Sequence, residues 1–340
     1  MRQRNGDTIE QMIGNTGLIE LKKINPYREK GIKIYVKCEY MNPTGSIKDR
    51  IAKYIFDTAE SEGKLTKGMT VVAASSGNTA CSVAFIAAQR GYKCKVITNT
   101  KCSKEKQDAP KSFGAEVIVG PANVSTDSPD HYMNMATNMC KNNPDYYDID
   151  QYDNPLNPLA YYHSLGPEIW NQTSGNIDYF IAAGSTGGTI SGTSKYLKEA
   201  SEGRVQTVLA DPYGSVFYQY WKTRELITPR NFQVEGVGKE TIPLAMDIDL
   251  IDQCVQIDDK NAFETCYKLT KFEGLMVGGS SGLNVAAALK LASTLDGPAT
   301  IVTVCPDAGV KYLSKIYNQD WLEQNGFEGV NNPQLEETKQ

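Results

Sequence analysis

The sequence predicts an α/β fold in which parallel sheets are covered by helices on both faces. Apolar runs of strand length alternate with segments of helical periodicity along the chain. Each strand-like run leads into a glycine-marked turn and a helix, in repeated units of roughly 25–30 residues, as expected for βαβ folds. A hydrophobic content of 40% and a charged content of 22% over 340 residues are typical of a soluble globular protein with one large or two ordinary domains.

In the N-terminal half, strand and helix patterns follow one another with short turns between them. The expected strands are 18–21, 32–39, 69–74, 94–97 and 116–119, and the expected helices are 46–63, 80–89, 103–113 and 132–141. The first of these helices has Ser46 as a capping residue. Its apolar positions recur at a period of about 3.6 and are Ile47, Ile51, Tyr54, Ile55 and Ala59.

The C-terminal half continues the alternation up to a polar tail. We expect extended segments at 146–152 and 275–279, strands at 178–183, 205–210 and 299–305, and helices at 165–172, 190–200, 259–272, 284–293 and 311–317. Residues 215–250 show poor periodicity. No internal repeat or low-complexity linker divides the chain, so a domain boundary must be a crossing of the chain rather than a tether.

Charge and composition exclude several classes of function. The net charge of −5 and the pI near 5.3, without a cluster of lysine or arginine, argue against nucleic acid and anionic membranes as partners. No apolar run approaches the ~20 residues of a spanning helix, and the polar N-terminus does not resemble a signal peptide. With only His131 and His163 as histidines, the chain is unsuited to a His-rich metal site or a Ser-His-Asp triad, and we expect no metal.

The eight cysteines are scattered and include no Cys-x-x-Cys pair. Most lie in apolar runs, which is typical of reduced thiols in a core. We therefore expect a reducing compartment, the cytoplasm.

Lys48 is the first candidate for chemistry. The loop 41–45 contains Pro43 and Gly45 and cannot continue a regular element, so a helix begins after it with Lys48 in its first turn. A positive helix end, apolar neighbours and the lack of a paired carboxylate disfavour the ammonium form. A lysine that gives up its proton readily is what imine chemistry needs. The alternative is a solvated lysine in the first turn of a helix.

Three glycine-rich turns, each between a strand and a helix, are the other candidates. Gly184–Thr189 directs backbone N–H groups, threonine hydroxyls and a helix end to one point, which suits a phosphate. It matches neither the Walker pattern nor Gly-x-Gly-x-x-Gly, which disfavours a dinucleotide. Ser75–Thr79 offers donors that fit a carboxylate, and Gly278–Gly282 contains Ser280, which can donate or accept. Each turn could also be purely structural.

Ligands of open α/β sheets bind at the carboxyl ends of the strands, where these turns lie. A lysine, a phosphate-binding turn and a carboxylate-binding turn together indicate a cofactor that carries an aldehyde and a phosphate. Pyridoxal 5′-phosphate fits this description.

From about Ile9 to Phe327, the chain resembles the cysteine synthase and cystathionine β-synthase family of fold-type II pyridoxal-phosphate enzymes. The motifs occur in the order of the family: Ile13-Gly14-Asn15-Thr16, Asn42–Arg50, Ser76-Gly77-Asn78-Thr79, Phe113-Gly114-Ala115-Glu116, Asp150-Gln151-Tyr152, Thr186-Gly187-Gly188-Thr189, Gly278-Gly279-Ser280-Ser281-Gly282 and Pro306-Asp307.

The resemblance implies a tryptophan synthase β-like fold of two doubly wound domains with the cofactor in the cleft between them. Residues 8–45 and 150–327 would form the large cofactor-binding domain, and 46–149 a smaller, mobile substrate-binding domain. Residues 328–340 are expected to be a disordered tail. The resemblance also implies a homodimer, on which the residues themselves are silent.

The resemblance further implies a role for each candidate residue. Lys48 would carry the internal aldimine, Asn78 would bond the phenolic oxygen of the cofactor, and Ser280 would meet its pyridine nitrogen. The phosphate would be held by Ser185, Thr186, Gly187, Gly188 and Thr189. The carboxylate of the amino acid would be held by Ser75, Ser76, Thr79 and Gln151.

The reaction implied is β-replacement. An amino acid with a leaving group on Cβ displaces Lys48 from the cofactor, and the freed amine removes the α-proton. Loss of the β-group gives an aminoacrylate, to which a thiol or sulfide adds. Lys48 then serves as anchor, base and acid.

The substrate pair is less clearly indicated, because the motifs resemble two branches of the family. The segments 125–130, 157–161 and 211–215 resemble cystathionine β-synthases, whereas Gly166–Trp170 and the run after Pro306 resemble cysteine synthases. We favour serine or cysteine with homocysteine, giving cystathionine, with sulfide formation as a side activity. O-acetylserine or O-phosphoserine with sulfide is the alternative. No N-terminal Cys/His pair is present to bind haem, so none is expected.

Lys239 and Gly236 are candidates at the mouth of the site, because the family places this loop where the second substrate enters. Lys239 stands where the synthase branch tends to carry an aromatic residue, and it could attract an anionic group. A solvated loop lysine beside Glu240 is the alternative.

The departures Gly17, Ala80 and Ser185 from the family pattern leave a second class of function open. In this alternative the protein is a catalytically weak relative that binds the cofactor and acts through a protein partner.

Overall fold

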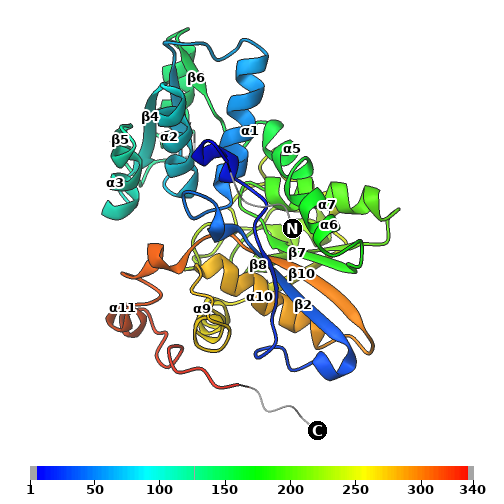
Figure 1. Ribbon diagram of the computed structural model, residues 1–340. Coiled ribbons are helices and arrows are strands. Elements are labelled where there is room, and N and C mark those ends of the chain that lie inside the picture. Colours follow the sequence, from blue (N-terminus) through cyan, green and yellow to red (C-terminus); the bar gives the residue numbers. More distant parts are fainter. Residues whose placement is uncertain (1–5, 126, 336–340) are drawn as a thin grey trace.

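A computed structural model describes residues 6–125 and 127–335 (Figure 1). The described chain forms two sheets of different size, each with helices on both faces. The predicted α/β class of parallel, doubly covered sheets is confirmed.

The larger sheet is built from both ends of the chain and its middle. Its strand order is β1-β2-β10-β7-β8-β9, with β1 antiparallel to β2 and the other neighbours parallel. The bounds are Leu18–Glu20, Ile32–Cys38, Ala299–Cys305, Tyr179–Ala183, Gln206–Pro212 and Gln253–Ile257 in that order. In the register, Ile34 lies opposite Ile301 and Val302 opposite Phe180, and all four side chains are buried. A parallel strand buried on both faces needs such a continuous apolar run.

The smaller sheet is parallel throughout and comes from one continuous stretch of the chain. Its order is β5-β4-β3-β6, with bounds Glu116–Gly120, Lys93–Asn99, Thr70–Ala74 and Tyr146–Asp148. Val71 and Ala73 of β3 face one core, whereas Val72 packs against Ala136 on the other face.

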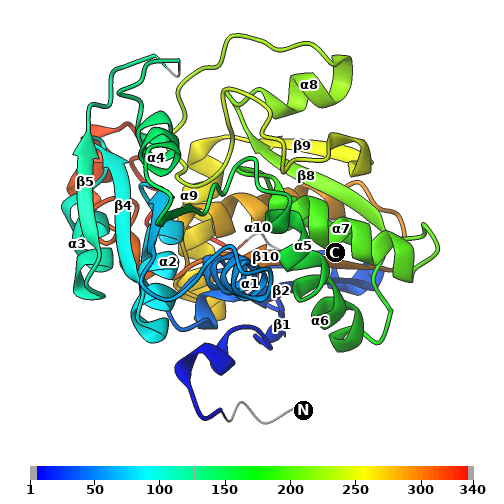
Figure 2. The same cartoon turned by 90° about the horizontal axis from the view of Figure 1, so that it is seen from above.

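Helices separate into layers around the two sheets (Figure 2). On the larger sheet, one face is covered by α9 (Asp259–Lys268) and α10 (Gly279–Ala292), and the other by α5 (Leu156–Tyr162), α6 (Leu165–Gln172) and α7 (Gly188–Ala200). On the smaller sheet, α2 (Asn78–Arg90) and α3 (Lys104–Ser112) lie opposite α4 (Tyr132–Lys141). Two further short helices are α8 (Phe217–Thr223) and α11 (Gln319–Gln324).

Helix α1 (Lys48–Ser61) lies where the two sheets meet. It packs on α2 of the smaller sheet and on α5 of the larger one. Its buried residues Ile51, Ile55 and Phe56 belong to a core cluster that includes residues of both sheets. The apolar periodicity of this helix therefore fixes the position of its first turn, with Lys48, between them.

Several short elements were missed by the sequence analysis. They are α5, α8, β9 and α11, each no longer than seven residues. Such lengths give too few turns or alternations to establish a period. The helix expected at 311–317 is a 3₁₀ turn, η6 (Gly309–Tyr312), followed by turns.

Two expected boundaries were wrong. Ser46 is not the cap of α1, because Ile47 occupies that position while Ser46 forms an isolated β-bridge with Asp307. The tail expected from 328 includes Val330, which is buried with the core of the larger sheet. Residues 336–340 lie outside the described residues.

Strands of the predicted large and small domains fall in the larger and smaller sheet respectively. Mobility of the smaller domain stays a prediction.

Over the described residues, no helix combines the length and apolar character needed to cross a membrane.

Candidate active site

A cavity of about 320 Å³ lies between the two sheets, at the carboxyl ends of their strands. Its walls come from the residues that follow β3, β6, β7 and β10, together with the start of α1. This is the edge at which open α/β sheets bind ligands. With the exception of Gly188, every site residue predicted from the sequence lines this cavity.

Lys48 lines the cavity as the first residue of α1. The segment before it is held by the bond from Ile47 N–H to Pro306 O (2.8 Å) and by the bridge from Ser46 to Asp307. Burial lowers the pKa of Lys48 to about 8; the negative charge of Asp307 opposes this shift, and the positive charge of Lys239 adds to it. A fraction of the amine is therefore unprotonated near neutral pH. Lys48 forms no ion pair within the described residues, and Asp307 acts on it as a nearby charge that the sequence did not indicate.

The turn between β7 and α7 forms one wall. Ser185, Thr186, Gly187 and Thr189 line the cavity. Gly188 lies behind them, where a Cβ would come within 1.9 Å of Asn157 Oδ1. At Gly187, φ is +87° and a Cβ would meet Met246 at 2.4 Å, so both positions require glycine.

The turn between β3 and α2 faces the cavity with Ser75, Ser76, Asn78 and Thr79. Thr79 Oγ1 donates to Gln151 Oε1 (2.6 Å), and Gln151 Nε2 donates to Ala74 O (2.9 Å). These bonds fix Gln151, which also lines the cavity, beside the hydroxyl groups of the turn. Hydroxyls, an amide and a helix N-terminus at one wall suit a carboxylate.

Ser280 lies in the first turn of α10, with 6% of its surface exposed. Within the described part of the chain, its hydroxyl makes no recorded hydrogen bond, and it lines the cavity. Because a buried hydroxyl normally has a hydrogen-bond partner, the lack of one within the protein leaves this hydroxyl available to bond a ligand.

Gly236 and Lys239 line the cavity, as do Tyr132 and Tyr152. Lys239 is half-buried, with Nζ 4.1 Å from the ring centroid of Tyr152. Burial lowers the pKa of Lys239, against the charges of Tyr132 and Glu240. Lys239 is therefore only partly solvated.

The family model described as "Pyridoxal-phosphate dependent enzyme" matches residues 9–307. The chain belongs to this family. Its cofactor is pyridoxal 5′-phosphate, as predicted.

Named relatives fall in both branches of the resemblance. The chain is 39% identical over 334 residues to the cystathionine beta-synthase of Apis mellifera, covering 96% of this chain and 65% of the relative. It is 39% identical over 322 residues to cysteine synthase 1 of Neurospora crassa, covering 94% of this chain and 85% of that one. A solved structure, O-ureido-L-serine synthase, aligns with a TM-score of 0.84 and 27% identity over 92% of this chain and 94% of that chain.

The cavity fits the cofactor of this family on its own geometry. In the turn of residues 185–189, Asn157 Nδ2 donates to Thr186 Oγ1 over 2.9 Å and so fixes this hydroxyl at the cavity wall. Lys48 and Ser280 supply an amine and a free hydroxyl in the same cavity. The pyridoxal-phosphate enzyme fold predicted from the resemblance is thereby confirmed.

Several residues of the site were not predicted. Asp307 was noted only as part of a motif, yet its carboxylate is buried at the cavity and accepts from Asn78 Nδ2 and Tyr312 OH, each at 2.7 Å. Lys311 Nζ donates to Asn78 Oδ1 at 2.7 Å. Glu235, which also lines the cavity, pairs with Lys106 of α3 and with Lys315. In the sequence, the only feature that could have indicated Glu235, Asp307 and Lys311 was that they lie in or near the motifs at 236–239 and 306–307.

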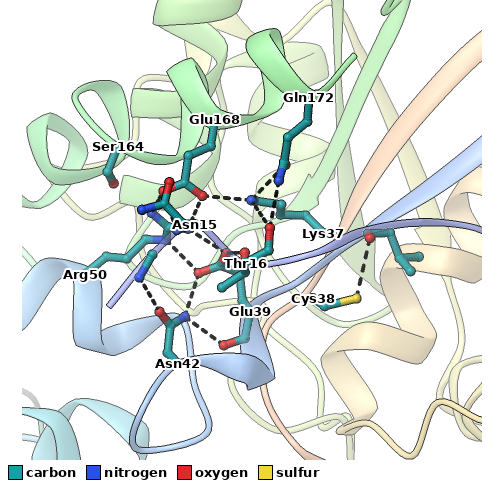
Figure 3. A network of polar contacts seen from close by, with 12 residues as sticks. Asn15, Thr16, Lys37, Cys38, Glu39, Asn42, Arg50, Ser164, Glu168 and Gln172 are labelled. Carbon is teal, nitrogen blue, oxygen red and sulfur yellow. Dashed lines mark hydrogen bonds and ion pairs between the residues drawn. The ribbon is translucent and has the colours of Figure 1, made fainter. Parts of the chain in front are cut away.

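Behind the cavity, a buried network joins α1 to α6 and β2 (Figure 3). Arg50, two residues after Lys48, donates to both oxygens of Glu39 (2.7 and 2.8 Å) and of Glu168 (2.8 Å each). Lys37 donates to Glu168 (2.7 Å) and to Thr16 O (2.8 Å). The network holds the motif of residues 13–16 beside α1, the helix that carries Lys48, which gives this motif a structural role.

Removing the hydroxyl of Ser280 tests its contact with the ligand. We expect Ser280→Ala to keep the cofactor but to lose about 1–3 kcal/mol of transition-state stabilisation, measured as kcat/KM. The neighbouring Ser281→Ala is the matched control, because Ser281 is fully buried and does not line the cavity. Full activity of Ser280→Ala would show that this hydroxyl does not serve the reaction.

Proposed function

We propose that this enzyme catalyses β-replacement on a β-substituted L-alanine, with a thiol or sulfide as the second substrate. The observation that carries the proposal is that one cavity is lined by Lys48, by the turn at 185–189, which suits a phosphate, and by the turn at 75–79, which suits a carboxylate. The names of relatives in both branches support it.

In this proposal each wall of the cavity binds a different group of the cofactor or of the substrate. Residues 185–189 hold the cofactor phosphate, Asn78 bonds the phenolic oxygen and Ser280 meets the ring nitrogen. The carboxylate of the amino acid is held by Ser75, Ser76, Thr79 and Gln151. When bound, the cofactor supplies the carbonyl carbon for an imine and an electron sink at Cα. Ser280 is neutral, which weakens this sink and favours elimination at Cβ.

Lys48 moves the protons. Its amine, with a pKa of about 8, can take the α-proton of the amino acid and return it after the new bond at Cβ has formed. With this pKa both the amine and the ammonium are populated near neutral pH, and the ammonium that Lys48 becomes on taking the α-proton is the acid of the second half of the reaction.

For the substrate pair we propose serine or cysteine with homocysteine, giving cystathionine, and sulfide formation from cysteine as a side activity. Cysteine synthase activity on O-acetylserine or O-phosphoserine is the second candidate, favoured by the equal identity to a cysteine synthase and by the likeness to O-ureido-L-serine synthase.

A substrate matrix tests the pair. Serine, cysteine, O-acetylserine and O-phosphoserine are each combined with homocysteine and with sulfide, and kcat/KM is compared. We expect the highest value for serine or cysteine with homocysteine. A higher value for an O-activated serine with sulfide would overturn this assignment in favour of a cysteine synthase.

A catalytically weak relative that acts through a protein partner is the alternative of another class. The departure at Ser185, which lines the cavity as part of the turn at 185–189, motivates it. The two are distinguished by adding the amino acid donor to the yellow protein: an enzyme changes the visible spectrum and turns over, whereas a weak relative retains its colour.

We also propose a cytoplasmic homodimer, because family members bury an apolar face of the large domain. Light scattering should give twice the 37.4 kDa of one chain. A mass of one chain would refute the dimer.

Lys239 is proposed to attract the anionic group of a substrate at the mouth. The ammonium above Tyr152 has no acidic ion-pair partner among the described residues. Lys239→Ala should therefore lower kcat/KM with homocysteine, or with O-phosphoserine, by roughly 5- to 150-fold, equivalent to about 1–3 kcal/mol. Sulfide addition to O-acetylserine carries no such group and is the internal control. Equal losses in both reactions, or no loss, would contradict a role in recognition.

A further inference from the structure

The amide of Asn78 lies between two opposite charges at the cavity. Lys311 Nζ donates to Asn78 Oδ1, and Asn78 Nδ2 donates to Asp307 Oδ2, each over 2.7 Å. An ammonium has only donors and a carboxylate only acceptors. The reverse orientation of the amide would place two donors together at Lys311 and two acceptors together at Asp307. Only one orientation satisfies both partners.

Asp307 is itself fixed in place. It is 1% exposed, and Tyr312 OH donates to the same oxygen that accepts from Asn78 (2.7 Å). Its backbone forms the bridge with Ser46, two residues before Lys48. The carboxylate therefore has a defined position relative to both Lys48 and Asn78, and it cannot follow Asn78 if the amide turns.

The two charged residues and Asn78 come from opposite sides of the cavity. Asn78 begins α2, which covers the smaller sheet, whereas Asp307 and Lys311 follow β10 of the larger sheet. Asn78 and Asp307 both line the cavity. The amide has two N–H groups, and Asp307 is the single recorded acceptor of Nδ2 within the described chain.

We infer that Lys311 and Asp307 are positioning residues for Asn78: together they hold its amide in the one orientation that leaves the second N–H free for the phenolic oxygen of the cofactor. The inference rests on the proposed role of Asn78. The new element is that the role of Asn78 depends on the cation of Lys311 and the anion of Asp307, which come from the other side of the cavity.

The visible spectrum of the cofactor-loaded protein reports on this bond. A hydrogen bond donated to the phenolic oxygen favours its anionic, yellow form over the protonated form that absorbs at shorter wavelength. Lys311→Met should raise the share of the shorter-wavelength band at a given pH. It should also weaken cofactor binding to the apoprotein roughly 3- to 10-fold, as expected for one misaligned hydrogen bond.

A double-mutant cycle separates positioning from simple stabilisation. If Lys311 acts through Asn78, then Asn78→Ala shifts the spectrum and Lys311→Met adds nothing in the Asn78→Ala background. Lys311→Arg should restore the parental spectrum, because it keeps the cation. Lys315→Met is the matched control, since Lys315 lies on the same segment but pairs with Glu235. Asp307→Asn removes the charge with little change of shape, and it provides a second variant should Lys311→Met fail to fold.

The outcomes are distinct. A parental spectrum and cofactor affinity in Lys311→Met, or additive shifts in the double variant, would overturn the positioning role while leaving the role of Asn78 intact. An unchanged spectrum in Asn78→Ala would overturn the role of Asn78 and the inference with it. Failure of the proposed β-replacement would instead appear as absence of turnover in the substrate matrix with the parental protein.

Discussion

Lys48→Ala is expected to abolish turnover and the covalent attachment of the cofactor. Lys48 lines the cavity as the first residue of α1, with a pKa lowered to about 8. Loss of a positioned proton-transfer group alone costs about 10²–10⁴-fold in rate. Because Lys48 is also the proposed site of attachment, we expect kcat to fall to the background. Borohydride reduction followed by intact mass measurement should add the cofactor to the parental protein and not to the variant.

The same cavity provides the control for this experiment. Lys239 is the other lysine whose pKa burial lowers at the cavity, and its ammonium lies over Tyr152 rather than at the start of α1. Lys239→Ala should retain the covalent label after reduction. Label retained in Lys48→Ala but lost in Lys239→Ala would contradict the assignment, as would turnover by Lys48→Ala.

Local patterns predicted most of the site. The turns at 75–79 and 184–189 each combine a strand, small residues and a helix start within about a dozen residues, and such signals survive folding because their geometry is local. The strand expected before 278–282 is only an isolated β-bridge at Val277, but the helix start predicted there is present as α10. Lys48 was found for the same reason, as the first turn after a Pro/Gly loop. The cause of its low pKa was only partly anticipated, since burial between the two sheets dominates and Asp307 opposes it.

Contacts between distant segments could not be predicted from one sequence. The bond from Asn78 to Asp307 spans 229 positions, and that from Lys311 to Asn78 spans 233. Neither residue type nor spacing indicates such a pair. The missed elements have a different cause: in β9, the pattern Gln253–Ile257 has mostly half-buried residues and no clean alternation. Its place at the edge of the sheet explains this incomplete burial.

Replacing Arg50 should be the most destabilising single change outside the cavity. Its side chain is 2% exposed and Glu39 is fully buried, so Arg50→Met leaves a buried carboxylate without its cation. Loss of one partner of a buried ion pair costs about 3–5 kcal/mol. Unfolding in urea at pH 7 should show this loss. Arg224→Met is the control, since Arg224 is 49% exposed and its partner Asp249 81%, and we expect a cost of about 1 kcal/mol or less.

The charges of the network predict how the stability loss of Arg50→Met changes when Glu39 is also replaced and when the pH is lowered. The net charge of the network is zero with two cations, Lys37 and Arg50, and two anions, Glu39 and Glu168. It is also zero for Lys37 and Glu168 alone. The double variant Arg50→Met, Glu39→Met should therefore be more stable than the sum of the two single losses predicts, because it removes one charge of each sign.

The pKa of Glu168 gives the direction of the pH effect. Burial raises this pKa, but the hydrogen bonds and charge of Arg50, with those of Lys37, outweigh burial and lower it from 4.5 to about 2. A lowered folded pKa gives stability that is present above pH 4.5 and is lost as the pH falls towards 2. In Arg50→Met the uncompensated carboxylate gains stability on protonation, so the difference from the parent should narrow as the pH falls from 7 towards 4.5. A difference that is constant over this range would mean that Arg50 stabilises the fold by packing rather than by its charge.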